Sequence, residues 1–152
     1  MVNIEDYNHL VVDIDDTLIY GRFVEFIDRC WRLFKSKRLA VLLMMIQQRF
    51  RLYKVNHRVA ELIVKSVYRS DIKVTFLTAR GKSEYTKKMI GDIFSFDPDI
   101  FELVELGSDH PNYDKYDWID ENGLDDVLLI DDNFKTRITC WKICDVIHPG
   151  DL

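Results

Sequence analysis

Three carboxylates stand close together near the start of the chain, at the end of a short apolar run. The run Leu10–Ile14 is typical of a buried strand, and Asp13, Asp15 and Asp16 lie at its end. Because side chains alternate along an extended chain, Asp13 and Asp15 point to the same side. Such crowded carboxylates repel one another unless a cation neutralises them, and hard oxygen ligands favour Mg²⁺. We therefore expect a magnesium site here.

Two later apolar runs also end in polar groups. They are 127–130, followed by Asp131 and Asp132, and 74–77, followed by Thr78 and Arg80. Taken singly, such residues are ordinary loop or helix-capping groups. In an open α/β sheet, however, ligands bind beyond the carboxyl ends of the strands. Together the three runs predict one site that combines acids, a hydroxyl and a cation.

The elements that must position these residues alternate along the chain. Apolar runs predict strands over 10–14, 74–77, 101–106 (as a sheet edge), 127–130 and 145–147. Helical spacing predicts helices over 59–67, 85–93 (capped by Ser83), 112–121 (closed by Gly123) and 134–144. This alternation indicates βαβ units, and thus an α/β domain over residues 1–152 with a parallel sheet of about five strands.

Residues 22–58 interrupt this rhythm with a basic, helix-like insert. The insert holds ten Lys or Arg and two acids, a net charge of +8, whereas the rest of the chain carries −13. Aromatic and apolar residues recur there at helical spacing, and the longest apolar run of the chain, Leu39–Ile46, follows them. The recurring residues are Phe23, Phe26, Ile27, Trp31 and Phe34. We expect a hairpin of helices whose apolar face is buried over the site and whose charge attracts anionic substrates. The alternatives are a solvated hairpin, or contact with an anionic membrane surface.

Composition places the chain among ordinary globular proteins. It has 152 residues, 47% hydrophobic and 31% charged, with a net charge of −5. Its longest apolar run has eight residues, against the roughly 18 that span a bilayer, and its acidic first residues do not resemble a signal peptide. Three cysteines, Cys30, Cys140 and Cys144, favour a reducing cytoplasm. Cys140 and Cys144 are expected to share a helix face and to pack in the core. No nucleic-acid readout motif is present, so no nucleic-acid partner is expected.

The ordered set of motifs resembles the haloacid dehalogenase (HAD) superfamily. The segment VVDIDDTLI resembles its first motif, DxDx(T/V); FLTAR resembles the second; and VLLIDDN resembles the fourth. Lys115 lies where the lysine of the third motif is expected. The match spans residues 10–133, with residues 22–58 at the position of a family cap. The resemblance implies a HAD-like Rossmannoid three-layer sandwich with a small helical cap.

The resemblance also implies roles for individual residues. Asp13 would be the nucleophile and Asp15 the general acid and base. Thr78 and Lys115 would bind the transferring phosphoryl group, and Arg80 would contact the substrate. The metal ligands would be Asp13, Asp15 and Asp132, together with Asp131. The implied activity is Mg²⁺-dependent hydrolysis of a small phosphomonoester through an aspartyl-phosphate on Asp13.

Several points stay open at this level. Thr136 stands where many relatives carry a further Asp, so the third metal-contacting group is undefined. Lys135 competes with Lys115 as the lysine of the third motif. The alternative functions are a catalytically weak binding or regulatory module, and a membrane-surface protein that acts through residues 22–58. Neither the substrate nor the oligomeric state follows from the sequence.

Overall fold

The computed structural model describes residues 3–69, 71–97 and 99–152, and its centre is a five-stranded parallel sheet. The strands are β1 (His9–Val12), β4 (Lys73–Thr78), β5 (Glu102–Glu105), β6 (Val127–Ile130) and β7 (Asp145–Ile147), in the spatial order β5-β4-β1-β6-β7. In the register of the central strand, Val11 stands beside Thr75 on one side and Leu129 on the other. The α/β class and the parallel sheet of about five strands predicted from the sequence are therefore confirmed, with 102–105 at an edge as expected.

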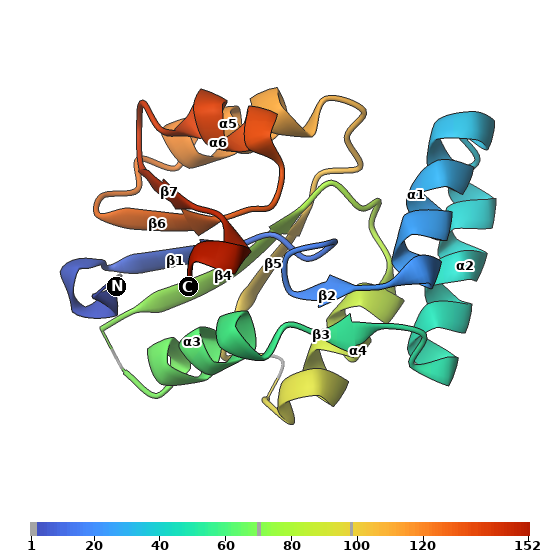
Figure 1. Cartoon of the computed structure of the whole chain (residues 1–152), viewed down its shortest axis with the longest axis horizontal. Helices are drawn as coiled ribbons and strands as arrows, with labels where there is room; N and C mark the ends of the chain where they lie inside the picture. Colours follow the sequence, from blue (N-terminus) through green and yellow to red (C-terminus); the bar gives the residue numbers. More distant parts are fainter. Residues whose placement is uncertain (1–2, 70, 98) are drawn as a thin grey trace.

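Helices cover both faces of this sheet (Figure 1). One face carries α3 (His57–Val67) and α4 (Glu84–Phe94), and the other carries α5 (Pro111–Glu121) and α6 (Phe134–Cys140). Side-chain caps begin several of them: Ser83 accepts a hydrogen bond from the Tyr85 amide, as the sequence predicted, and Asn133 caps α6. Short 3₁₀ helices lie at Ile4–Asp6 and Pro149–Asp151. The result is a three-layer Rossmann-like sandwich.

The buried strand β1 divides the core into two clusters. Leu10 and Val12 pack in the cluster that contains Ile63 of α3, whereas Val11 packs in the cluster that contains Ile119 of α5. This division follows from the period of two along a strand, which sends successive side chains to opposite faces. A strand covered on both faces is apolar throughout, and this is why LVV could be recognised in the sequence.

Within residues 22–58, two helices lie beyond the carboxyl ends of the strands (Figure 1), and the last two of these residues already begin α3. The two helices are α1 (Arg22–Phe34) and α2 (Lys37–Phe50), joined by two residues. The chain leaves and re-enters the core through β2 (Ile19–Tyr20) and β3 (Lys54–Val55), which pair antiparallel. These two-residue strands are too short to produce a sequence pattern and were not predicted.

Two details of the sequence prediction are wrong. The last helix ends at Cys140, so Cys144 lies beyond it in a turn, although its thiol still donates to the Cys140 carbonyl. The insert does not bury all the apolar side chains expected to face the site: Phe26 and Phe34 are 48% and 63% exposed. Phe26 lies at the edge of the apolar arc, whereas Phe34 lies within the arc but is the last residue of α1, where its ring extends beyond the packed part of the helix. None of the described helices is long and apolar enough to cross a membrane.

We predict that Phe76→Ala lowers the free energy of unfolding by about 3–5 kcal/mol, because it leaves a cavity in the larger cluster. Phe76 is fully buried and its ring centroid lies 5.2 Å from that of Phe101. Leu33→Ala is the control, since Leu33 is 76% exposed, and it should change stability by less than about 0.5 kcal/mol. Urea unfolding followed by circular dichroism measures both, and equal losses would contradict this description of the core.

Candidate functional site

The predicted functional residues meet at the point where the order of the sheet reverses. Successive strands are added on one side of β1 as far as β5, and the chain then crosses to β6 on the other side. Asp13 follows β1, and its amide donates to the Ile130 carbonyl of β6 at 3.0 Å. Asp131 directly follows β6, and Thr78 ends β4. A switch point of this kind leaves a crevice between adjacent loops, where ligands of open α/β sheets bind.

A buried ammonium joins the first two acids. Lys115 Nζ lies 2.6 Å from Asp13 Oδ1 and 2.6 Å from Asp131 Oδ2. All three side chains are buried, with at most 9% of each exposed. Lys115 projects from α5, whose first turn begins with Pro111, a residue suited to a helix start. The geometry therefore separates the two candidate lysines, because Lys135 is exposed at the rim whereas Lys115 contacts Asp13.

The protonation of this group is set by burial and by the charges within it. Burial raises the pKa of Asp13 to about 8; Lys115 acts against this shift, while Asp131 and Asp15 add to it. Burial by itself would lower the pKa of Lys115, but Asp13 and Asp131 outweigh it, so the pKa is raised and the ammonium stays charged. Burial and Asp131 also raise the pKa of Asp132. Additional positive charge would favour the ionised carboxylates.

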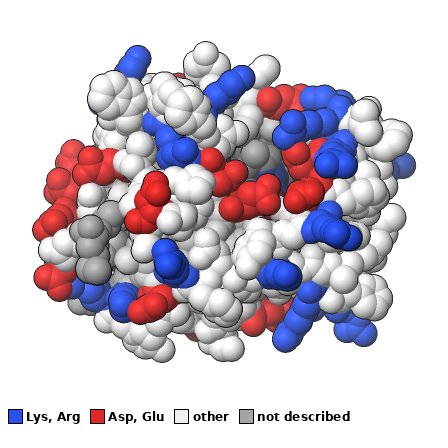
Figure 2. Space-filling model, in the orientation of Figure 1, with Lys and Arg blue, Asp and Glu red and all other residues white. Residues whose placement is uncertain are grey.

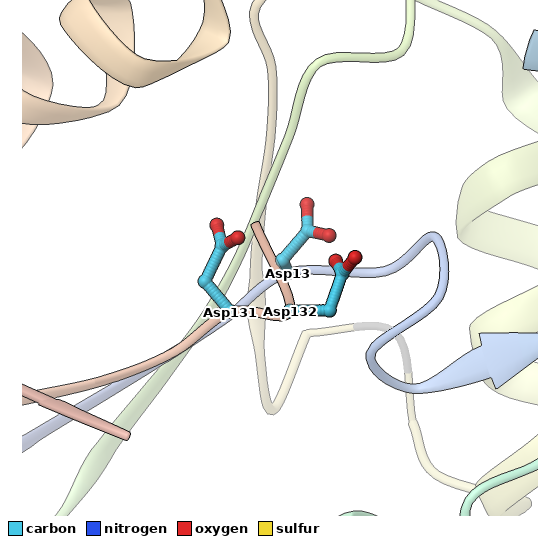
Figure 3. A group of neighbouring side chains, drawn as sticks. All are labelled: Asp13, Asp131 and Asp132. Atoms are coloured by element: carbon cyan, nitrogen blue, oxygen red, sulfur yellow. The ribbon is translucent and has the colours of Figure 1, made fainter. Parts of the chain in front are cut away.

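The residues present fit a divalent cation. Asp13, Asp131 and Asp132 each offer a carboxylate oxygen, and these oxygens lie within 4.8 Å of one another. Figure 3 shows the three side chains extending from adjacent segments. Three carboxylates and one ammonium leave a net charge of −2 when all are ionised. The buried Thr136 hydroxyl borders the same space and has no hydrogen-bond partner in the described chain. An all-oxygen donor set of this charge suits Mg²⁺.

Thr17 and Arg137 fix the loop that carries the two later acids. Thr17 Oγ1 accepts a hydrogen bond from the Asp132 amide at 3.0 Å and lies 3.2 Å from Asp132 Oδ1. Arg137 Nη1 donates to the Asp131 carbonyl at 2.8 Å and also to the Asp132 carbonyl. The fully buried Thr17 thus ties the turn after β1 to the turn after β6. Neither residue was assigned a role from the sequence, although a Thr directly after three acids was a usable signal.

Asp15 does not join the carboxylate cluster and instead pairs with Arg80. Arg80 Nε and Nη2 lie 2.8 and 2.6 Å from the two Asp15 oxygens, a bidentate arrangement. Arg80 Nη2 also donates to Gln47 Oε1 at 2.9 Å. Gln47 belongs to α2, is fully buried, and its Nε2 has no partner among the described residues. The insert therefore reaches Asp15 through Arg80, a link that the sequence did not reveal.

A cavity of about 530 Å³ lies between the sheet and the insert. The acids form its floor, together with Thr78, Arg80 and Lys115. The insert contributes an apolar wall from Val24, Ile27, Trp31 and Met44, with Arg32 and Lys35 at its rim. Of these two cations, Arg32 pairs with Asp28 at 2.6 Å and Lys35 with Asp109 at 2.7 Å. All predicted catalytic and substrate-binding residues thus border one space, which has room for a small organic phosphate.

Comparison with known proteins supports the fold. No protein-family model matches this chain, and no curated protein matches it. A solved structure described as a hydrolase, a haloacid dehalogenase-like family protein from Streptococcus pneumoniae, superposes with a TM-score of 0.53 over 97% of both chains. The two sequences are 8% identical, so the likeness is one of fold. The chain therefore has a HAD-like fold, as the sequence resemblance implied.

We expect Lys115→Met to destabilise the protein by about 3 kcal/mol or more in the presence of EDTA. Removing the ammonium leaves buried carboxylates without their partner. Lys135→Met is the matched control and should change the free energy of unfolding by less than about 0.5 kcal/mol. If the two variants have similar urea midpoints, Lys115 is not the lysine that stabilises the buried carboxylates.

The raised carboxylate pKa values predict how Mg²⁺ stabilisation depends on pH. A group whose pKa rises from 3.8 when unfolded to about 8 when folded stabilises the protein at low pH, and this contribution is lost as the pH rises through about 8. The metal-free protein should thus lose stability between about pH 5 and pH 8. Mg²⁺ binds the ionised carboxylates. The increase that Mg²⁺ produces in the melting temperature of the protein should therefore be larger at about pH 8 than at about pH 5.5. Scanning calorimetry with Mg²⁺ and with EDTA tests this, and an equal increase at both pH values would contradict it. Asp13→Asn should reduce the difference.

Proposed function

We propose that this chain is a Mg²⁺-dependent phosphomonoester hydrolase in which Asp13 is the nucleophile. The observation that carries the proposal is the placement of Asp13. Its carboxylate is buried at the switch point of the sheet, is held by Lys115, and borders a cavity with two further acids. The likeness of this fold to that of a solved haloacid dehalogenase-like hydrolase supports the same reaction class. The three free thiols suit the reducing compartment that we propose for it.

The proposed first step is attack by an Asp13 carboxylate oxygen on phosphorus. A bond forms between that oxygen and phosphorus, and the bond from phosphorus to the ester oxygen breaks. Lys115 stays protonated and stabilises the charge on the phosphoryl oxygens, and the Thr78 hydroxyl contributes a hydrogen bond. Mg²⁺ held by Asp13, Asp131 and Asp132 would supply the positive charge that keeps Asp13 ionised and shields it from the phosphoryl oxygens.

Asp15 is the proposed proton donor and acceptor. It would give a proton to the departing ester oxygen, and then accept one from the water that attacks the aspartyl-phosphate, releasing inorganic phosphate and restoring Asp13. In the structure both Asp15 oxygens accept from Arg80. Asp15 must therefore leave part of this pair when it transfers a proton, which gives Arg80 a role in positioning it.

The insert is proposed to act as a cap. Its helices stand over the carboxyl edge of the sheet (Figure 1), and its apolar wall, which includes Trp31, faces the acids across the cavity. A substrate that fills this space would carry its phosphate to the floor and place an apolar or aromatic group against the insert. Attraction of anionic substrates by the charge of the insert stays a prediction; at the rim of the cavity, Arg32 pairs with Asp28 and Lys35 with Asp109.

Asp13→Asn should reduce turnover by roughly 10³-fold or more, because an amide is a poor nucleophile and a poor metal ligand. The assay is phosphate release from a panel of sugar phosphates, nucleotides, lipid phosphates and phosphopeptides with Mg²⁺. Asp16→Asn is the matched control: Asp16 borders the same cavity and has φ 58°, a conformation that Asn tolerates. It should keep activity within about tenfold.

Acid quenching during turnover should also trap phosphorylated wild-type protein, and none in Asp13→Asn. If the variant keeps more than about a tenth of the activity, Asp13 is not the nucleophile. If the folded wild-type protein binds Mg²⁺ but hydrolyses nothing on the panel, the protein is a binding module instead.

A further inference from the structure

The outer face of α2 presents apolar side chains that the rest of the described chain covers only in part. Val41, Leu42 and Met45 are 37%, 48% and 37% exposed. Arg38 and Arg49 are exposed one turn before and one turn after them. The spacing of these five residues places them on one side of the helix, as neighbours three and four apart are. We call this set the α2 outer face.

The charge around the α2 outer face has one sign. No Asp or Glu occurs between Asp28 and Glu61, a stretch that holds nine Lys or Arg. Within the described chain, neither Arg38 nor Arg49 forms an ion pair. Figure 2 shows Lys and Arg gathered at the end of the molecule where α1 and α2 lie, whereas acids lie at the opposite end and in the middle of the view, beside the basic group. Solvated charge alone does not explain apolar side chains exposed among these arginines.

The position of α2 suits contact with an extended surface. The opposite side of the helix is buried through Leu43, Met44 and Gln47, so α2 is fixed to the body. The hairpin forms one end of the molecule (Figure 1), and Phe50, beside Arg49, is 69% exposed. A flat surface could therefore meet α2 while the cavity stays on the inner side of the insert.

We propose that the α2 outer face binds the protein to an anionic membrane surface. Exposed apolar side chains can enter the boundary between headgroups and acyl chains, and flanking arginines bind anionic headgroups. A second copy of this chain fits less well, because a symmetric contact would bring identical positive faces together. The proposal goes beyond hydrolysis and does not depend on it, since membrane binding can be measured without a substrate.

The test is co-sedimentation of the whole protein with vesicles. Wild-type protein should sediment with vesicles made of equal parts phosphatidylcholine and phosphatidylserine, and should stay in solution with phosphatidylcholine alone. Replacing both arginines, Arg38→Gln with Arg49→Gln, should weaken binding by about 25-fold, roughly fivefold for each charge removed. Leu42→Ser with Met45→Ser should weaken it by about tenfold while the positive charge is kept. Raising the salt concentration should weaken binding of the wild-type protein.

A charge-matched control separates this face from net charge. Lys65→Gln with Lys142→Gln removes two exposed charges outside the insert and should leave vesicle binding within about twofold. Circular dichroism checks that each variant is folded. All variants are expected to fold, because the replaced side chains are exposed. The proposal is overturned if folded wild-type protein ignores the anionic vesicles, or if the control pair weakens binding as much as the arginine pair. It is also overturned if light scattering shows that the α2 outer face joins two copies, or if duplex DNA binds there and vesicles do not.

Discussion

The site depends on the cost of burying several carboxylates together. Asp13 and Asp131 leave water almost completely, and in the low dielectric of the interior their repulsion is far stronger than at the surface. The Lys115 ammonium, 2.6 Å from both, makes this arrangement possible. It also connects three elements that are distant in sequence, because the contact to Asp13 spans 102 positions and the contact to Asp131 spans 16. Removal of either kind of charge leaves the other without compensation, so β1, β6 and α5 must be positioned together.

The insert is held by polar contacts as well as by its apolar wall. The paired strands β2 and β3 bring its two ends together, and Gln48 of α2 donates to Asp92 of α4 at 2.8 Å. Lys35 and Asp109 join α1 to a loop of the body, but both are about half exposed, so this contact is weak. The Gln47–Arg80 contact differs from these because it is buried and because Arg80 also binds Asp15 in the site. Burying Gln47 with an unpartnered Nε2 costs free energy, and that cost is offset by the contact made at Oε1.

The sequence predicted the parts of the site that depend on short stretches of the chain. Apolar runs located β1, β4 and β6 because these inner strands are buried, and the polar residues that end them were placed correctly at one edge. The edge strands β5 and β7 are only half-buried and gave weaker or shorter runs. Gln47 acts through Arg80, 33 positions away, and Arg137 through backbone carbonyls of the loop before its own helix. In the sequence both look like any polar helix residue. Lys115 was the preferred lysine and Lys135 the competing candidate until the structure showed that Lys115 is the buried one. Phe26 and Phe34 were expected inside because helical spacing shows that residues share a broad face, but not how much of it a neighbour covers.

The two sides of α2 make one physical system. Its buried side carries Gln47, which contacts the arginine that holds Asp15, and its outer face carries Val41, Leu42 and Met45 between two arginines. A packed helix moves as a unit, because its interior contacts are close to crystal density and do not deform independently. Since Arg80 engages both oxygens of Asp15, an unbroken series of contacts runs from α2 through Gln47 and Arg80 to the candidate site.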